Sequence, residues 1–517
     1  MDILTNTQYT IYEKLYKFVN DDIDKNEYLN NIILLSASAG TGKTFILSVL
    51  IRDLLKNTDG KICVACPTHV SLNIIMSKIY QFMTNEVDCE KLMEKLELMT
   101  IQKLLKYKKS IDKHGNEIFE KNKSTKIKLT KYKLIIVDEC SMIQENTYED
   151  LMNEIKKKNN KTKIIFNGDE FQLPPVNTII SPIFKNINNK LTLTEIVRTK
   201  SIDIMNISNM FRLWISNNIP PKFMDYKNSP NIQLWKMENE NEFLEDYIKN
   251  INNGNNIILG WTNEVVDKYN EYIRKNIFNK KLLEQYEVGE FLIFKKFHLI
   301  KIKIFDEVEN ITKYKNISFH TSEKVKIVDI KIENKKLNTM TNHLAETNDE
   351  FIKINELINK FTKEFNDIIS KELKIYNMKI LKKDNMEYNI CTLHPLSLKS
   401  FKEYKYDTEH LIKKFKIDSY NLLKKLMSSI TTDKLYEYQT KVDEIIQTIW
   451  NSYYNIYSEI AELNYGYSMT THKSQSATFD DVYINITDIY KNTDELERKK
   501  LLYTAITRTS NKVHLIK

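Results

Sequence analysis

The sequence contains few glycine, proline and cysteine residues. Its 517 residues include only nine glycines and eight prolines, whereas lysine, asparagine and isoleucine are abundant, a bias typical of an AT-rich genome. Part of the lysine content can therefore reflect base composition rather than selection for binding. The five cysteines are odd in number and scattered along the chain, which suits a reducing compartment.

A zinc site is not expected from these cysteines. Cys63 and Cys66 form one CxxC pair, but no second pair of Cys or His follows at the spacing of a zinc site. The segment KICVACPT around them is typical of a buried strand that runs into a loop. We therefore expect a structural role for this pair rather than a metal or redox site.

Signals for export and for membrane insertion are missing as well. The N-terminal segment MDILTNTQYT has neither the basic start nor the apolar stretch of a secretory signal. No apolar run approaches the roughly 20 residues that a membrane-spanning helix needs. We expect a soluble, intracellular protein without a membrane partner, and the sequence does not distinguish cytoplasm, nucleus and a viral replication site.

Length and charge set the remaining bounds. At roughly 150 residues per domain, a chain of this length suggests three or four domains. Hydrophobic residues make up 42% of the sequence, which is enough for ordinary buried cores. The formal net charge of +8 is modest, and it fits a polyanionic partner better than an acidic chain would.

The first chemical motif follows a short apolar run. Residues 31–51 read NIILLSASAGTGKTFILSVLI, in which small residues separate that run from a stretch of helical periodicity. A strand, a glycine-rich turn and a helix are the setting of a phosphate-binding loop, whose backbone N–H groups point at anionic oxygens. Gly40 and Gly42 would let that backbone approach closely. Ala37 stands where the first glycine of such loops usually lies.

Four side chains carry the phosphate and magnesium chemistry. Lys43 would supply positive charge to the β- and γ-phosphates of a nucleotide, and the Thr44 hydroxyl would bind magnesium. In KLIIVDECSMI, residues 133–143, an apolar strand ends at Asp138 and Glu139, where open α/β sheets bind their ligands. Asp138 would hold magnesium, and Glu139 would orient and deprotonate the attacking water. The alternative for such a pair is a solvated strand end.

A third strand ends in a further polar motif. Residues 164–176 read IIFNGDEFQLPPV, in which an apolar run is followed by Gly-Asp, a glutamine and a rigid Pro-Pro. Gln172 could hydrogen-bond both the γ-phosphate and the attacking water, and it would thereby report the nucleotide state to the rest of the chain. The alternative is a turn without a chemical role.

The order of the motifs makes them more specific than any one of them alone. In sequence order they are SASAGTGKT, CPTHVS, TIQKLL, IIVDECSMI, GDEFQLPPV, LTEIVRT, GWTNEVVDKYN, SMTTHKSQS and LLYTAITRT. This set resembles the motifs of superfamily 1B helicases, and THKSQ is similar to the RecD/Dda/Pif1 branch rather than to Upf1-like RNA helicases. The resemblance covers residues 1–295 and 460–517. Ser476 stands where the family usually has glycine.

The resemblance implies an α/β fold with two RecA-like P-loop NTPase domains, each built on a parallel sheet, and ATP with Mg²⁺ between them. It implies a catalytic set of Lys43, Glu139, Gln172, Arg198 and Arg508. It implies a nucleotide-binding set of Gln8, Ala39, Gly40, Thr41, Gly42, Lys43, Thr44 and Tyr503, with Thr504 nearby. An arginine at the γ-phosphate can accelerate transfer by about 10³ to 10⁵. Gln8 would read adenine, and its alternative is a surface glutamine on an amphipathic helix.

The same resemblance places a single DNA strand across both domains. The residues implied to touch it are Thr68, His69, Thr100, Gln102, Thr262, Asn263, Thr471, His472 and Lys473. Contacts of hydroxyl, amide and backbone groups with phosphate carry no sequence information. We therefore expect binding that is largely independent of base sequence and that weakens with salt.

The domain organisation follows from the same pattern. We predict a RecA-like domain 1A at 1–200, a RecA-like domain 2A at 201–293 and 461–517, and an insertion 2B at 294–460. Within the first domain, residues 105–130 form two polar arms around a turn at 112–116, a small hairpin insertion called 1B. In similar helicases such a hairpin is a wedge at the duplex fork, and the alternative is a basic surface hairpin.

The insertion 2B is predicted to have two parts. YEVGEFLIFKK and FHTSEKVKIVDIKI, between residues 286 and 330, indicate strands of a small barrel. At this place in the chain such a barrel resembles the SH3-like module of the 2B region in this branch. The stretch from 340 to 460 has helical periodicity and is read as a helical elaboration. Its lysines and aromatic residues could serve a nucleic-acid strand or a protein partner, although core packing with solvated faces explains them as well.

Together these features predict an ATP-dependent DNA helicase that moves along single-stranded DNA, 5′ to 3′ by resemblance, and opens forked duplex as a monomer. An ATP-dependent RNA helicase is one alternative, because no clear signature of 2′-OH recognition is present. A nucleotide-gated remodeller without unwinding is another. A comparison of ATPase stimulation by DNA and by RNA distinguishes a DNA helicase from an RNA helicase. Displacement of a strand from a forked duplex distinguishes a helicase from a remodeller.

Overall fold

The computed structural model describes residues 4–21, 28–83, 89–111, 117–121, 127–157, 161–175, 178, 180–197, 199, 201–252, 255–280, 282–306, 311–336, 352–426, 432–475 and 477–517. The chain divides into two compact units, each described by itself below. The parallel-sheet unit comprises Met1–Lys108, Lys121–Leu283 and Gly466–Lys517. The insertion unit comprises Lys109–Glu120 and Glu284–Tyr465.

The first sheet of the parallel-sheet unit has six strands in the order β3-β2-β6-β7-β1-β8, and all neighbours pair in parallel. Its strands are β1 (Ile32–Ala37), β2 (Lys61–Cys66), β3 (Leu96–Thr100), β6 (Tyr132–Val137), β7 (Lys163–Gly168) and β8 (Lys190–Leu193). The apolar runs of β1 and β7 are buried along their whole length, as expected for a parallel sheet covered on both faces.

Helices cover both faces of this sheet because successive strand residues point to opposite sides. Ile33 and Leu35 of β1 pack in one core, and Ile32 and Leu34 pack in the other. The helices of the first core are α1 (Asn6–Asn20), α2 (Lys43–Asn57), α3 (His69–Met83) and α4 (Cys89–Met93). Those of the second core are α5 (Ile101–Leu104), α6 (Glu145–Ile155) and α7 (Pro182–Asn186).

The second sheet of the same unit has five strands in the order β18-β10-β19-β20-β9, again all parallel. Its strands are β9 (Ile232–Trp235), β10 (Ile257–Gly260), β18 (Ser468–Thr470), β19 (Phe479–Asn485) and β20 (Thr509–Ile516). Its helices are α8 (Ile202–Asn217), α9 (Glu240–Asn250), α10 (Asn263–Phe278), α14 (Ile486–Tyr490) and α15 (Glu495–Ile506). The predicted α/β fold class with two parallel sheets is confirmed.

A small hairpin sheet is formed by β4 (Tyr107–Ile111) and β5 (Glu117–Lys121), in the position predicted for the two arms of hairpin 1B. Its predicted turn, 112–116, lies outside the described residues. Tyr107 anchors the first arm by donating a hydrogen bond from its hydroxyl to Asp150 of α6 at 2.8 Å.

The insertion unit contains an antiparallel sheet in the order β16-β15-β14-β11-β17. Its strands are β11 (Phe291–Phe294), β14 (Lys324–Lys336), β15 (Glu372–Leu381), β16 (Glu387–Leu393) and β17 (Leu463–Tyr465). A separate two-stranded sheet joins β12 (His298–Asp306) to β13 (Ile311–Phe319). The strands predicted between residues 286 and 330 are therefore present.

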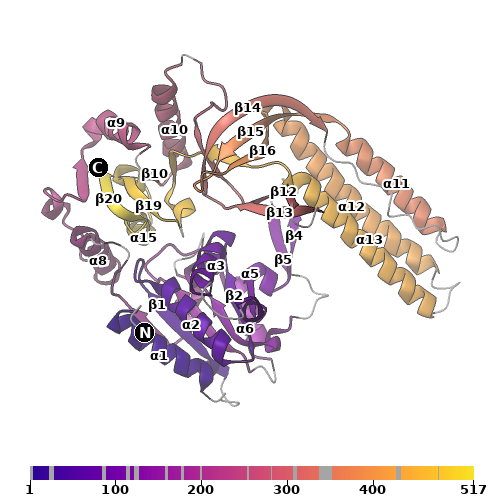
Figure 1. Ribbon diagram of the computed structural model, residues 1–517, viewed down its shortest axis with the longest axis horizontal. Helices are drawn as coiled ribbons and strands as arrows, with labels where there is room; N and C mark the ends of the chain where they lie inside the picture. The colour runs from indigo at the N-terminus through magenta and orange to yellow at the C-terminus, as the bar shows by residue number, and fades with distance from the viewer. Residues whose placement is uncertain are drawn as a thin grey trace. The chain divides into compact units, whose positions relative to one another are not determined.

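Three long helices complete the insertion unit: α11 (Ile352–Ile369), α12 (Leu398–Leu426) and α13 (Thr432–Ser458), with α12 packed against both of the others (Figure 1). The helical prediction for 340–460 is right for these segments and wrong for residues 372–393, which form the hairpin β15–β16. Leu373 and Ile375 pack in the core with the long helices, and Met378 packs in a second core. Asn385 takes the left-handed conformation of a tight turn with φ +62°.

The predicted boundaries at residues 200, 293 and 461 stay a prediction. The two compact units divide at Leu283/Glu284 and at Tyr465/Gly466, and both parallel sheets belong to one unit. Within the described part of the chain, no helix has the length and apolar character needed to cross a membrane.

Candidate nucleotide and nucleic-acid site

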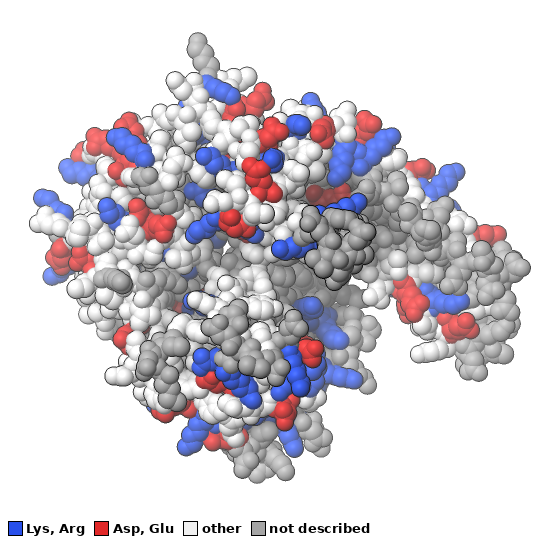
Figure 2. Space-filling model, in the orientation of Figure 1, with Lys and Arg blue, Asp and Glu red and all other residues white. Residues whose placement is uncertain are grey.

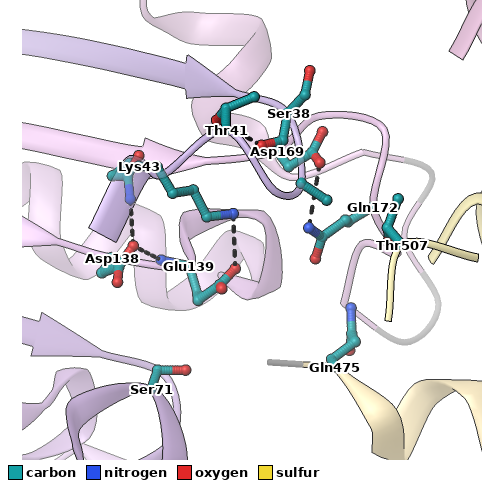
Figure 3. A network of polar contacts seen from close by, with 12 residues as sticks. Ser38, Thr41, Lys43, Ser71, Asp138, Glu139, Asp169, Gln172, Gln475 and Thr507 are labelled. Atoms are coloured by element: carbon teal, nitrogen blue, oxygen red, sulfur yellow. Dashed lines mark hydrogen bonds and ion pairs between the residues drawn. The ribbon is translucent and has the colours of Figure 1, made fainter. Parts of the chain in front are cut away.

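The turn between β1 and α2 has the backbone geometry of a phosphate-binding loop. Gly40 and Gly42 both have φ +79°, a left-handed conformation that favours glycine, and Gly42 is the N-cap of α2. A Cβ atom on Gly42 would lie 2.6 Å from Nε2 of Gln8, so a side chain there would also displace the end of that glutamine. Within the loop, the Thr41 hydroxyl donates to the Ser38 carbonyl at 2.8 Å (Figure 3). The first N–H groups of α2, which have no partner within the helix, would suit an anion.

Lys43, Asp138 and Glu139 lie together at this loop, as Figure 3 shows. Lys43 Nζ is 3.7 Å from a carboxylate oxygen of Glu139. Asp138 is 2% exposed, and its Oδ1 accepts hydrogen bonds from the Glu139 N–H at 2.9 Å and from the side-chain amide of Asn167. Burial, reinforced by the charge of Glu139, raises the pKa of Asp138 from 3.8 to about 6, although Lys43 opposes the shift.

The donor set fits magnesium rather than zinc. Among the described residues, no group of three or more His, Cys, Asp or Glu side chains is placed to hold a metal ion. Mg²⁺ is commonly held by only one or two protein oxygens together with nucleotide phosphates and water. The buried Asp138 carboxylate and the hydroxyl of Thr44, one residue beyond Lys43, are hard oxygen donors of that kind.

Asp169 and Gln172 follow β7, next to the phosphate-binding loop. Asp169 is 1% exposed, and its Oδ2 accepts a hydrogen bond from Nε2 of Gln172 at 3.3 Å. Gly168 precedes them in a crowded position, because a Cβ atom there would lie 2.6 Å from Sγ of Cys140. This packing lets the end of β7 lie close to the segment after β6.

Tyr503 of α15 connects the two parallel sheets at the nucleotide site. Its hydroxyl donates to Oδ2 of Asp169 at 2.9 Å and accepts from the N–H of Ala39, in the phosphate-binding loop, at 3.2 Å. Its ring, 1% exposed, makes an edge-on contact with Phe171 at 6.1 Å between centroids. The sequence placed Tyr503 near the nucleotide, and the structure places it against the loop itself.

Two further contacts between the two parallel-sheet halves of this unit were not foreseen from the sequence. Lys500 donates from Nζ to the Glu170 carbonyl at 3.0 Å, and Gln475 donates from Nε2 to the Leu173 carbonyl at 3.1 Å. Burial lowers the pKa of Lys500 to about 8, against the opposing effect of Asp169 and Glu170. Gln475 belongs to the quoted THKSQ motif, which is the only signal that could have drawn attention to it.

The two arginines have different outcomes. Arg508 is 2% exposed, and its guanidinium donates to the carbonyls of Thr504 at 3.0 Å and Ala477 at 3.4 Å and to the hydroxyl of Thr507 at 3.3 Å. All of these partners belong to the second-sheet half of the unit, so an approach of Arg508 to a γ-phosphate would exchange some of these bonds. Arg198 lies outside the described residues.

Gln8 is a buried residue, and the alternative of a surface glutamine is wrong. It is 3% exposed on α1, and Thr5 and Gln8 form a reciprocal capping box at the helix start. Gln8 Nε2 also donates to the Thr41 carbonyl at 3.0 Å. The side chain is thus held against the phosphate-binding loop, and its role in reading adenine stays a prediction.

Most of the residues predicted to touch a nucleic acid lie at or just beyond the carboxyl ends of β-strands. Thr68 and Thr100 follow or end β2 and β3, and their hydroxyls accept from the N–H groups of Ser71 and Lys103, each at 3.3 Å. Thr262, after β10, caps α10 and donates to Asp488 at 2.9 Å. Exposed surface at these edges is provided by the neighbouring side chains His69, Asn263 and Lys473 and, in part, Gln102 and His472.

The predicted contact of Thr471 with the nucleic acid needs correction. Thr471 has no exposed surface, and its hydroxyl donates to the Gly260 carbonyl at 3.1 Å, so its side chain ties β10 to the following turn rather than facing a ligand. The next residue, His472, is half-buried, with Nε2 3.5 Å from Glu497. Burial lowers the pKa of His472, and Glu497 opposes the shift. At neutral pH we therefore expect a neutral imidazole that can donate one hydrogen bond.

The remaining features of this unit agree with a structural role. Cys63 and Cys66 are free and fully buried in β2, and burial raises the pKa of both thiols, as expected for packing residues rather than reactive ones. On the face shown in Figure 2, basic and acidic side chains are interspersed, so the net positive charge is not gathered into one patch there.

We expect Asp138→Asn to stabilise the protein at pH 8 when nucleotide and magnesium are absent. The raised pKa of Asp138 means that the native state holds this proton more tightly than the unfolded chain does, so stability falls as the pH rises from 3.8 to about 6. At one pKa unit per about 1.4 kcal/mol, the substitution should recover up to about 3 kcal/mol above that window and almost nothing at pH 4. Urea unfolding at both pH values measures this.

The matched control is Asp59→Asn, since the Asp59 carboxylate is fully exposed and should show no such difference. A lower stability of Asp138→Asn than of the parent at pH 8 would show that the carboxylate is not strained by burial.

Models of two known families match the chain. An AAA domain matches residues 21–178, and a UvrD-like helicase C-terminal domain matches residues 465–516. A protein of Acanthamoeba polyphaga mimivirus, described as uncharacterized, is 30% identical over 522 residues, which is 97% of each chain. The RecBCD enzyme subunit RecD of Buchnera aphidicola is 31% identical over 179 residues, 34% of this chain and 28% of RecD. The ATP-dependent DNA helicase Dda of Enterobacteria phage T4 is 27% identical over 273 residues, 50% of this chain and 55% of Dda.

These similarities agree with the order of the motifs and with the geometry of the site. The AAA match contains the phosphate-binding loop and the strands that carry Asp138 and Asp169, and the C-terminal match contains His472, Tyr503 and Arg508. The chain belongs to superfamily 1B of the helicases, in the branch that includes RecD, Pif1 and Dda.

Proposed function

We propose that this protein is an ATP-driven DNA helicase that moves along single-stranded DNA, 5′ to 3′, and separates forked duplex. One observation carries the proposal. Lys43, Asp138 and Glu139 meet at the carboxyl edge of the first sheet, and Tyr503, from the second-sheet half, contacts the same loop. The relatives include an ATP-dependent DNA helicase, which supports DNA as the substrate.

The phosphate chemistry is assigned as follows. Lys43 and the N–H groups of Gly42 and its neighbours would bind the β- and γ-phosphates. Magnesium, held by Asp138 and Thr44, would neutralise charge on the phosphate oxygens. Glu139, which lies 3.7 Å from Lys43, would turn to the attacking water once phosphates compete for the lysine. Gln172 would contact the γ-phosphate beside that water.

Coupling to movement is assigned to the contacts between the two sheets. A nucleotide drives a cycle only if it binds two arrangements of the protein with different affinity. Tyr503 touches both Ala39 and Asp169, so a phosphate bound at the loop acts directly on an interaction between the two sheets. We assign Arg508, and Arg198 beside the junction, to the phosphates in the closed arrangement.

The nucleic-acid strand is assigned to the exposed residues beyond the carboxyl strand ends. His69 and Gln102 would contribute from the first sheet, and Asn263, His472 and Lys473 from the second. Amide and imidazole groups and a single lysine would give contacts with the sugar-phosphate chain rather than base readout. We propose action as a monomer on single-stranded and forked DNA, with the hairpin β4–β5 as the wedge.

Forked duplexes with a single tail of either polarity test the proposal. We expect displacement of the labelled strand from the fork with a 5′ tail, little from the fork with a 3′ tail, and stimulation of ATP hydrolysis by DNA above that by RNA of equal length. Stronger stimulation of ATP hydrolysis by RNA than by DNA would mean that RNA, and not DNA, is the substrate. Strand-stimulated hydrolysis without displacement on either fork would reduce the protein to a remodeller.

Lys43→Ala should abolish ATP hydrolysis, by at least about 10³-fold, since it removes the charge that binds the transferred phosphate. Binding of a single-stranded oligonucleotide should change little, because Lys43 is 8% exposed and is not among the residues assigned to the DNA strand. Lys56→Ala is the matched control: it removes an exposed lysine from the last turn of the same helix. Normal turnover by Lys43→Ala would refute the assignment of the site.

Tyr503→Phe should lower strand-stimulated kcat about tenfold or more and change the KM for ATP much less. The ring is kept, whereas two hydrogen bonds across the seam are removed, one of them to the buried carboxylate of Asp169, at a cost of about 1.5–3 kcal/mol. Tyr12→Phe is the control, because Tyr12 also donates to a carboxylate, Asp53, at 2.7 Å, but between α1 and α2. Equal kinetics for the two variants would mean that Tyr503 does not couple the sheets.

A further inference from the structure

The long helix α12 of the insertion unit carries positive charge that its neighbours lack. Leu398–Leu426 contains eight lysines against four acidic residues, whereas α11 has three of each and α13 has two lysines against four acidic residues. All three helices belong to the same lysine-rich chain. Base composition therefore does not explain why the lysines gather on α12.

The helix separates its lysines from its apolar residues. Ile412, Phe415 and Leu423 are buried in the core of the three helices. The opposite side is exposed and carries the lysines Lys399, Lys402, Lys413, Lys414, Lys416, Lys424 and Lys425. This set is called the α12 lysine face below.

The acidic residues of α12 do little to neutralise this face. Glu409 is 3% exposed, and Glu403 and Asp407 are the exposed acidic residues among those described on this helix. Glu409 pairs with Lys413 at 2.7 Å and Glu403 with Lys399 at 3.9 Å. Seven exposed lysines against two exposed carboxylates leave a net positive face.

The neighbouring helix α13 differs from α12 in its exposed charge. Along α13, Glu437, Asp443 and Glu444 are exposed, whereas Lys441 is half-buried. Asp443 accepts a hydrogen bond from Tyr420 of α12, so acidic residues of α13 border the lysines of α12. A polyanion would thus be attracted to α12 rather than to α13.

The dimensions of the face match a duplex. At 1.5 Å per residue, the 29 residues of α12 extend for about 43 Å, somewhat more than the roughly 34 Å of one turn of B-DNA. Double-stranded DNA presents about one phosphate charge per 1.7 Å of its axis, a stiff row of charge against which a straight row of lysines can lie. A single strand would call for a series of exposed aromatic rings along the helix, whereas the exposed rings among the described residues of α12 are Tyr406, 45% exposed, and His410 stacked beside it.

We propose that the α12 lysine face binds the phosphate backbone of duplex DNA without regard to base sequence. This inference rests on the proposed function, in which DNA is the substrate. It assigns a role to a helix that lies between the segments matched by the two family models, 21–178 and 465–516. Flexible, exposed lysines on one helix side suit nonspecific backbone contacts, which position a duplex and read no bases.

The test replaces Lys402, Lys414, Lys416 and Lys424 together by glutamine. Glutamine has nearly the helix propensity of lysine, so α12 should persist, as circular dichroism and thermal melting can verify. The affinity for a blunt, labelled duplex of 30 base pairs is measured by fluorescence anisotropy at several salt concentrations. Removing one lysine–phosphate interaction lowers the slope of log K against log salt by about 0.9, so we expect a decrease of about 2 to 4 for the fourfold variant.

The matched control replaces Lys185, Lys222, Lys227 and Lys249, four exposed lysines of the parallel-sheet unit, by glutamine, with the same change in net charge. Its slope should change by less than about 1. If the α12 variant and the control variant show the same slope of log K against log salt, the proposal is overturned. An acidic protein would then be the partner to test for the α12 lysine face. Should the fourfold variant misfold, the double variant Lys402→Gln/Lys424→Gln, with an expected decrease of about 1 to 2, decides the question.

ATP hydrolysis stimulated by a short single-stranded oligonucleotide separates this proposal from the function on which it rests. Both variants should keep that stimulation, because none of the eight lysines lies in the assigned nucleotide or strand site. Loss of duplex affinity with intact stimulation supports the α12 lysine face. Absence of stimulation in the parent protein would contradict the helicase function, and the duplex slopes would still report on α12 alone.

Discussion

The candidate site depends on the parallel pairing of the strands in the first sheet. Because β1, β6 and β7 all run in the same direction, they end at one edge of the sheet, and the segments that follow them meet there. The loop before Lys43, the pair Asp138–Glu139 and Asp169 are therefore brought together although more than a hundred residues separate the first from the last. In an antiparallel sheet, neighbouring strands would deliver these groups to opposite edges.

Burial then makes that edge sensitive to charge. Asp138 and Asp169 are 2% and 1% exposed, and the carboxylate of each accepts hydrogen bonds from protein groups. In such a setting electrostatic interactions are stronger than in solvent, so a phosphate and a cation bound there, as proposed, would shift the balance of the nearby contacts. Tyr503 links this edge to the second sheet, which gives the change in charge a path to the rest of the unit.

The parts of the fold and site that could be predicted from the sequence are those in which a local pattern determines the structure. The glycines of the loop before Lys43 require left-handed backbone, and the apolar run before Asp138 is a buried strand, so both were found in place. The hairpin β15–β16 was missed because helical periodicity on either side obscured its alternating pattern. Lys500 and the buried state of Thr471 could not be foreseen, since both depend on contacts between segments remote in sequence.

A structure of the protein with magnesium and a non-hydrolysable ATP analogue tests the central claim most directly. The account predicts that the triphosphate lies along residues 40–44, with its γ-phosphate between Lys43, Gln172 and the second-sheet residues Tyr503 and Arg508, and with the cation at Asp138. It also predicts that the ion pair between Lys43 and Glu139 is broken in that state. A nucleotide bound elsewhere, or bound at the loop with no second-sheet residue near its γ-phosphate, would contradict the account.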